Sequence, residues 1–178
     1  MAAKKTAEFT IVNRRTGKAL TAVGADNGQN VVQAALTNED TQVWMQAGSR
    51  GPVKFINKAS GKALDVVDGG VENGTWAHVW DDLEDAPSQK WEVVRLTATY
   101  KKLKNVQSGK MLDIVDMSEE DGALAQLWDD VEGEGQQWKF VPVQSEEPAP
   151  APAKEEPVKK APAKKAAAKK PAARKKAK

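Results

Sequence analysis

One pattern occurs three times in the chain, and this repetition limits the possible folds more than any other feature. The pattern Asn-x-x-Ser/Thr-Gly-Lys occurs at 13–18, 57–62 and 105–110, and a Gln-x-Trp motif follows each copy. The three motif tryptophans are spaced 47 residues apart both times. Three units of about 45 residues therefore fill residues 8–143, and a unit of that size cannot bury its apolar face without its neighbours.

The spacing of apolar residues within each unit has a period of two. Apolar and polar residues alternate over 9–11 and 64–66, as in half-buried strands. Asn27-Gly28, Asn73-Gly74 and Ser108-Gly109 interrupt these runs with the residue pairs that favour hairpin turns. The sequence predicts an all-β fold of many short strands, with almost no helix and with three units around one axis.

The three units resemble the ricin-type β-trefoil lectin family. The resemblance covers about 8–143 and includes Leu-Asp-Val/Ile and Gly-x5-Trp elements in units two and three. It implies twelve strands in a β-trefoil, with one potential sugar site per unit. We expect an N-terminal extension at 1–7, followed by the trefoil at 8–143.

The Gln-x-Trp residues are expected to be structural. A buried tryptophan fills a small core well, and a buried glutamine must satisfy backbone groups where the strands turn. These residues are Gln42, Trp44, Gln89, Trp91, Gln136 and Trp138.

A candidate binding face follows from strand alternation in units two and three. If Leu64 and Val66 point inward, Asp65 points outward. The same alternation places the polar and aromatic candidates of the matching strands on the outward face. The resemblance implies that this aspartate and an aromatic residue bind the sugar, assisted by a polar residue two positions before the aromatic. The candidate residues are Asp65, His78 and Trp80 in unit two and Asp113, Gln126 and Trp128 in unit three.

The sequence departs from the family pattern in two places. In unit one Thr21, Val32 and Ala34 replace the aspartate, the polar helper and the aromatic, so we predict no sugar site there. Family sites commonly carry an asparagine just before the Gln-x-Trp glutamine, where this chain has Ser88 and Gly135. The resemblance therefore does not imply specificity for galactose.

Two other interpretations of the candidate face stay open. The tryptophans could pack on neighbouring loops and the aspartates could brace turns, which would leave the trefoil as a protein-interaction module. We predict no catalysis, because each unit supplies one candidate aspartate and glycoside hydrolysis needs two carboxylates around one bond. With no cysteine, one histidine and no EF-hand spacing in the acidic segments 81–85 and 129–134, we expect no metal or cofactor and solvated acidic loops.

The charge of the chain is divided between its two parts. Residues 144–178 hold eleven Lys/Arg against four Glu, a net of +7, which leaves −5 for residues 1–143 of a chain with +2 overall. Residues 144–157 are rich in Pro, Ala and Glu and are expected to form an extended linker. Residues 158–178 carry ten positive charges and no acid, so we expect a disordered tail that resembles the tails of linker histones.

The tail is expected to bind a polyanion, with nucleic acid as the first candidate. An anionic membrane surface, a nuclear localisation signal and a solubility element are alternatives. The residues concerned are Lys159, Lys160, Lys164, Lys165, Lys169, Lys170, Arg174, Lys175, Lys176 and Lys178.

Two functions therefore remain in view. The first is a carbohydrate-binding trefoil joined to a polycationic tail. The second is a nucleoid- or chromatin-associated protein whose trefoil binds another protein and whose sugar sites are vestigial. The start of the chain shows no apolar signal region and no run approaches a membrane span, so we expect a cytoplasmic location. Association with the nucleoid is an alternative, and the nucleus is expected if the source is eukaryotic.

Overall fold

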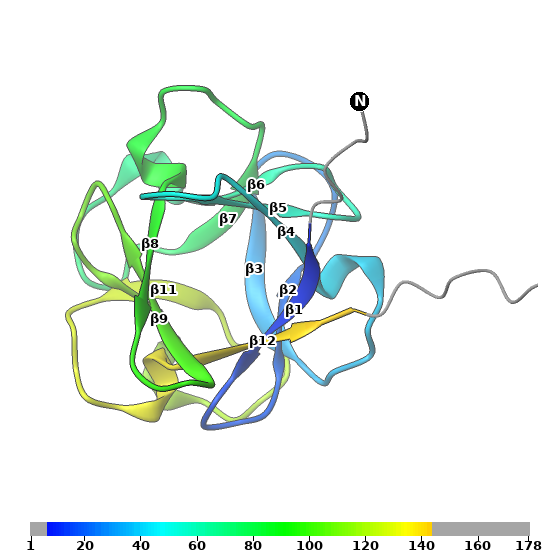
Figure 1. Cartoon of the computed structure of the whole chain (residues 1–178), viewed down its shortest axis with the longest axis vertical. Helices are drawn as coiled ribbons and strands as arrows, with labels where there is room; N and C mark the ends of the chain where they lie inside the picture. Colours follow the sequence, from blue (N-terminus) through cyan, green and yellow to red (C-terminus); the bar gives the residue numbers. More distant parts are fainter. Residues whose placement is uncertain (1–6, 144–178) are drawn as a thin grey trace, which may run out of the picture. The chain divides into compact units, whose positions relative to one another are not determined.

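The computed structural model describes residues 7–143 as twelve strands and five three-residue 3-10 turns (Figure 1). Unit one comprises β1 (Glu8–Asn13), β2 (Ala19–Ala22), β3 (Gln29–Ala34), η1 (Asp40–Gln42) and β4 (Val43–Ala47). Unit two comprises β5 (Lys54–Asn57), β6 (Ala63–Val66), η2 (Val67–Gly69), β7 (Ala77–Trp80), η3 (Pro87–Gln89) and β8 (Trp91–Arg95). Unit three comprises β9 (Tyr100–Asn105), β10 (Met111–Ile114), η4 (Val115–Met117), β11 (Ala125–Trp128), η5 (Glu134–Gln136) and β12 (Trp138–Pro142).

The strands form a barrel and a cap of three hairpins. In the barrel β1 pairs with β12 and β4, β4 with β5, β8 with β9, and β9 with β12. A bridge between Val53 and Trp91 closes the ring. The hairpins β2–β3, β6–β7 and β10–β11 meet through the β3–β7 pairing and two further bridges, Val32 to Leu124 and Trp76 to Gln126. This arrangement confirms the predicted β-trefoil.

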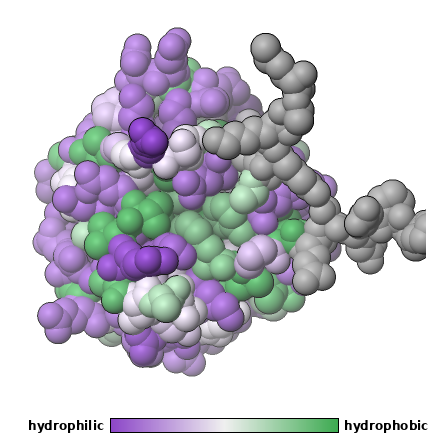
Figure 2. Space-filling view, viewed as in Figure 1, coloured by the Kyte–Doolittle hydropathy of each residue, from purple (hydrophilic) through white to green (hydrophobic). Residues whose placement is uncertain are grey.

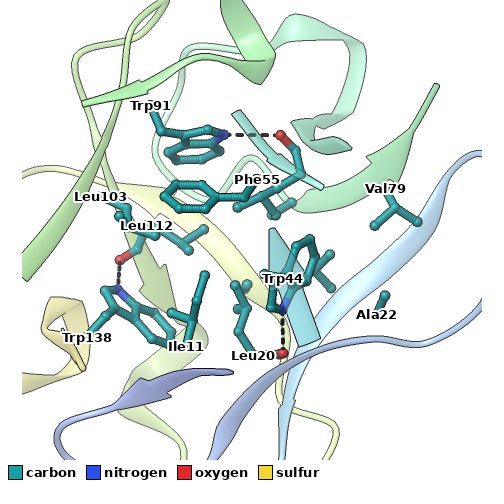
Figure 3. Close-up of a cluster of buried hydrophobic side chains, with 14 of the residues drawn as sticks. Ile11, Leu20, Ala22, Trp44, Phe55, Val79, Trp91, Leu103, Leu112 and Trp138 are labelled. Carbon is teal, nitrogen blue, oxygen red and sulfur yellow. Dashed lines mark hydrogen bonds between the residues drawn. The ribbon is translucent and has the colours of Figure 1, made fainter. Parts of the chain in front are cut away.

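The core is built around the three Gln-x-Trp tryptophans (Figure 3). Trp44, Trp91 and Trp138 are fully buried, and each indole Nε1 donates a hydrogen bond of 2.9–3.1 Å to a leucine carbonyl of its own unit. Since a buried indole N–H needs a partner, these bonds let the rings fill the core without an unsatisfied donor.

The Asn-x-x-Ser/Thr-Gly-Lys motif is a turn that also joins two units. In unit two Asn57 Oδ1 accepts from the backbone N–H of Ser60, and Ser60 Oγ accepts from that of Lys62, each at 3.2 Å. Gly61 has a φ of +68°, which favours glycine. Asn57 Nδ2 then donates to the Thr41 carbonyl of unit one at 2.9 Å. The corresponding bonds recur around the axis, so each copy ties its unit to the preceding one.

The lysine that ends the motif takes part in a second contact between units. Lys62 Nζ lies 2.6 Å from a carboxylate oxygen of Asp81, and this carboxylate accepts a 2.8 Å bond from the Asn27 amide of unit one. Lys110, Asp129 and Asn73 form the same cluster between units three and two. The lysine lowers the pKa of each aspartate, with the asparagine as the second cause.

Unit one keeps this contact with its charges rearranged. Ala35 stands in the place of the aspartate, and Asp121 of unit three stands in the place of the asparagine. Lys18 pairs with Asp121 instead. The carboxylate has thus moved across the boundary between units while the ion pair is retained.

The surface of the molecule is mixed in polarity. Figure 2 shows apolar areas among hydrophilic residues on the face seen in Figure 1. In the part of the chain that the structure describes, no helix has the length and apolar character needed to cross a membrane.

Candidate functional site

The three candidate residues of unit two lie around one hollow. Asp65 on β6 is directly opposite His78 on β7, and Trp80 is two residues further along β7. The hollow has a volume of about 230 Å³. Its other lining side chains include Asp68, Leu83 and Ser88.

The carboxylate of this site is buried and the indole is exposed. Asp65 and His78 are each 6% exposed, whereas Trp80 is 37% exposed. The expectation that Asp65 and His78 face solvent is therefore wrong. Alternation gives the correct face of the sheet, but η3 folds over that face and brings Gln89 against Asp65.

The carboxylate of Asp65 is held in its ionised form. Gln89 Nε2 donates to it at 2.9 Å and the backbone N–H of Val66 at 2.7 Å, while His78 Nε2 lies 3.7 Å away. Burial pushes the pKa of Asp65 upward, but the interactions with His78 and Gln89 outweigh burial and bring the pKa below its ordinary value.

The indole of Trp80 is positioned by two neighbours. The ring of His78 stacks on it with centroids 5.4 Å apart and an interplanar angle of 23°. Gly28 of unit one lies behind it, since a Cβ at Gly28 would stand 3.7 Å from the Trp80 ring. The Asn27-Gly28 turn, with a φ of +82° at the glycine, therefore also supports the candidate binding face of the next unit.

The site of unit three has the same plan with a larger hollow. Asp113 on β10 is opposite Gln126 on β11, and Trp128 follows two residues later. Asp113 and Gln126 are 8% and 6% exposed, so the expectation of outward-facing polar groups is wrong here too, while Trp128 is 39% exposed. The hollow of about 640 Å³ is also lined by Asp116, Met117, Val131, Gly133, Gly135 and Gln136.

The pKa of the buried aspartate is shifted in opposite directions at the two sites. Burial raises the pKa of Asp113, and hydrogen bonds from the Ile114 backbone, Gln136 and Gln126 offset this only in part. Gln126 stands where unit two has His78, so Asp113 lacks the imidazole contact that lowers the pKa of Asp65. Gly135 leaves room for this carboxylate, because a Cβ there would lie 3.3 Å from Asp113 Oδ1.

Unit one holds different chemistry at the matching positions. Thr21 Oγ1 donates to the Ala19 carbonyl at 2.9 Å and accepts a 3.3 Å bond from Gln42 Nε2. Val32 is buried, and Ala34 offers no ring. The prediction that this unit binds no sugar rests on these replacements.

The Gln-x-Trp glutamines connect the core to the walls of the hollows. Gln89 donates to the Asp81 carbonyl at 2.8 Å and accepts from the backbone N–H of Leu83 at 2.9 Å. Gln42 and Gln136 make the equivalent bonds in their own units. Each glutamine thus closes the loop that follows the aromatic position.

Two lysines also bond to these loops. Lys54 pairs with Asp82 at 2.5 Å and donates to the Leu83 carbonyl. Lys102, which is 4% exposed, pairs with Asp130 and donates to the Val131 carbonyl at 2.9 Å. The acidic segments 81–85 and 129–134 are largely exposed, as expected for solvated loops, and these ion pairs in addition hold them in place. Within residues 7–143, no cluster of three or more His, Cys, Asp or Glu is placed to hold a metal ion.

Several lining residues were not anticipated from the sequence. Asp68 and Asp116 add a second carboxylate to each hollow. Met117 has a φ of +51°, which is unfavourable for a side chain of this kind, and is 60% exposed at the hollow of unit three. Trp76 could have been found, because it alternates with His78 and Trp80 along one strand face.

Comparison with known proteins agrees with the fold. The family model for the ricin-type beta-trefoil lectin domain-like family matches residues 2–80 and 87–147. The chain belongs to this family. A sequence comparison with curated proteins gave no match.

Several solved structures match the chain and share its fold. The designed threefold symmetric protein ThreeFoil is 32% identical with a TM-score of 0.73, over 75% of this chain and 97% of its own. An exo-β-1,3-galactanase from Clostridium thermocellum is 31% identical with a TM-score of 0.74, over 79% of this chain but 31% of its own. The Macrolepiota procera ricin B-like lectin, solved with lactose, is 18% identical with a TM-score of 0.68, over 79% of this chain and 99% of its own.

Proposed function

We propose that the trefoil is a non-catalytic carbohydrate-binding module with working sites in units two and three. The observation that carries this proposal is the same in both units. A partly exposed indole stands beside a hollow whose floor is a buried, hydrogen-bonded carboxylate.

This geometry suits a sugar ring. The face of Trp80 or Trp128 packs against the apolar C–H side of a pyranose, and the carboxylate accepts hydrogen bonds from neighbouring hydroxyl groups. Because the carboxylate is already fixed by Val66 or Ile114 and by the Gln-x-Trp glutamine, little order is lost when the ligand binds. Two such sites on one chain also increase the apparent affinity for a glycan that presents several copies of the sugar.

The neighbouring proteins support a sugar as the ligand class. One is a lectin solved with lactose, and another is a galactan-degrading enzyme of which this chain matches about a third. The departures at Ser88 and Gly135 leave the identity of the sugar to experiment.

A neutral-glycan array tests this function. The full chain is compared with Trp80→Ala, Trp128→Ala and the double variant in 0.3 M salt, so that the basic tail adds little. Leu96→Ala, at a residue that is 42% exposed and outside both hollows, serves as the control. We expect partial loss in each single variant, complete loss in the double variant and no loss in the control. Equal binding by the full chain and the double variant would favour the protein-interaction alternative.

A second role is proposed for residues 158–178, which lie outside the described residues. The support is compositional, since ten positive charges occur in 21 residues without an acid. Such a segment binds phosphate backbones without reading base sequence, and each neutralised phosphate steepens the salt dependence.

Binding of the full chain to a random-sequence DNA duplex at several salt concentrations tests the tail. We expect the logarithm of the affinity to fall linearly with the logarithm of salt, with a slope of up to about −9 for ten contacts. A full-length variant with the ten basic residues changed to Gln should lose this binding and keep its glycan binding. If the Gln variant binds DNA as well as the parent, the tail is not the site.

A further inference from the structure

A second hollow adjoins the Asp65 hollow of unit two. Its volume is about 530 Å³, and it shares Asp68, His78 and Trp80 with the first. The remaining lining residues are Gly28, Asn30, Val67, Trp76 and Leu124. Trp80 and His78 therefore separate two adjoining spaces, of which the site described above uses one.

The new element in this hollow is Trp76. It directly precedes β7, and alternation places it on the same strand face as His78 and Trp80. It is 40% exposed, slightly more than Trp80. Its backbone is fixed by the bridge to Gln126 of unit three, so the indole projects from a well-held position.

The hollow lies where the three hairpins of the cap meet. Asn30, Trp76 and Leu124 occupy equivalent positions in units one, two and three, and all three line it. An exposed amide, the carboxylate of Asp68 and two indoles provide both hydrogen-bonding groups and stacking surfaces. This combination fits a sugar ring better than a purely apolar ligand.

The two adjoining hollows together offer room for a ligand longer than one ring. The Asp65 hollow alone is smaller than the roughly 300–1,000 Å³ typical of small-molecule sites, whereas the adjoining hollow falls within that range. We propose that unit two binds an oligosaccharide, with one sugar residue at Asp65 and Trp80 and the next stacked on Trp76. This inference rests on the proposed carbohydrate-binding function and extends it to a substrate class.

The extension is specific to unit two. Leu124 stands at the Trp76 position of unit three, so that unit has no second indole there. Its own hollow is instead bordered by Met117 and Val131. We therefore expect affinity to depend on chain length at unit two and much less at unit three.

The experiment isolates unit two in a full-length Trp128→Ala background. Calorimetric titration uses monosaccharides and the matching linear di- and trisaccharides of β-galactose, β-glucose, β-N-acetylglucosamine and α-mannose. For the series that binds, we expect the disaccharide to bind about five- to tenfold more tightly than the monosaccharide, as one added aromatic contact provides. Adding Trp76→Ala should remove this advantage and leave the monosaccharide affinity within twofold, whereas Trp76→Phe should retain most of it.

The possible outcomes separate this inference from the proposed function. Equal affinities for mono- and disaccharide in the Trp128→Ala protein would overturn the extended site and leave a single-ring site standing. So would a Trp76→Ala variant that weakens both ligands equally. If no sugar of the panel binds the parent chain, the proposed function and the extended site both fail. Unfolding midpoints of the Trp76 variants show whether each remains folded at the titration temperature.

Discussion

Gln89 donates a 2.9 Å hydrogen bond from its side-chain amide to the carboxylate of Asp65. One residue therefore belongs both to the repeat that builds the trefoil and to the candidate binding site. In unit one Gln42 makes the same loop-closing bonds, but it meets the hydroxyl of Thr21 in place of a carboxylate. Gln42 therefore shows the structural role of the motif alone, whereas Gln89 has this role and also contacts the candidate site.

Replacing these glutamines should have the same effect on stability and different effects on binding. Gln89→Ala and Gln42→Ala each remove two partly buried hydrogen bonds to the loop backbone, so each should lower the free energy of unfolding by about 1–3 kcal/mol. Only Gln89→Ala should also weaken sugar binding, because Asp65 loses a donor that fixes it. Denaturant unfolding and glycan titration measure the two effects. An equal fall in affinity for both variants would mean that the loss is a general effect of destabilisation.

The tryptophans should fall into two classes. Trp91 is fully buried, and Trp91→Ala should cost about 3–5 kcal/mol of stability. Trp80 is 37% exposed, and Trp80→Ala should cost about 1 kcal/mol or less while it abolishes binding at unit two. Chemical denaturation measures both values. A Trp80 variant as unstable as the Trp91 variant would show that the indole is a packing residue of the loops.

The two sites should respond differently to acid. As the pH falls from 7, Asp113 takes up its proton first, because its pKa lies above the ordinary aspartate value and that of Asp65 lies below. A protonated carboxyl accepts fewer hydrogen bonds, so unit three should lose its ligand at a pH at which unit two still binds. Trp80→Ala reports unit three and Trp128→Ala reports unit two, each titrated over pH 3–7.

The linked effect on folding has opposite signs at the two carboxyls. Asp65 contributes stability that is present above its unfolded-state pKa and is lost as the pH falls through its lower folded pKa. Asp113 lowers the stability increasingly as the pH rises from its unfolded-state pKa to its higher folded-state pKa, and acidification relieves this penalty.

Gln126→His places an imidazole beside Asp113 and should move the pH profile of sugar binding at unit three toward that of unit two. An unchanged profile would show that the histidine does not set the difference.

Two substitutions together should restore at Lys18 the charge arrangement of units two and three, whereas each alone should be destabilising. Ala35→Asp alone brings a second carboxylate toward Asp121 and should lower the unfolding midpoint, and Asp121→Asn alone removes the partner of Lys18. The double variant recreates the arrangement of units two and three and should recover most of the loss. Thermal unfolding at low and high salt gives the coupling. Additive losses would show that the three positions are independent.

Replacing Met117 with glycine should increase stability and weaken binding at unit three. Its φ of +51° is strained for a side chain, so Met117→Gly should gain about 0.5–1 kcal/mol after the entropy cost of glycine is included. The same change removes an apolar wall of the unit three hollow and should reduce affinity there. Binding to the Trp80→Ala background and denaturant unfolding test both parts. A destabilised glycine variant would show that the methionine side chain contributes more packing than its exposure indicates.

Much of the fold could be predicted because the residues that build it recur in each unit. Asn57 and Gly61 form a turn within six residues, and Trp91 bonds to a carbonyl of its own unit, so both features return at a constant spacing in the sequence. Such residues recur at regular intervals and are visible in the sequence. The three units, the all-β class and the β-trefoil follow from them.

The exposure and charge of the site could not be predicted in the same way. Alternation placed Asp65 on the correct face, but the side chain that covers it comes from Gln89, which lies 24 residues further along. The opposite pKa shifts depend on which neighbour meets each buried carboxyl, and burial itself depends on the loops of 81–90 and 129–137. Trp76 lies four residues before Trp80, outside the family motif, which includes only the polar residue two positions before the aromatic.

The decisive measurement is a calorimetric titration of one neutral glycan, chosen from the array, into the full chain and into the Trp80→Ala/Trp128→Ala double variant. We expect two sites per chain in the parent and no measurable binding in a double variant that is still folded. Unchanged binding in the double variant would show that the ligand does not lie against the indoles, and the assignment of the two hollows would then be wrong.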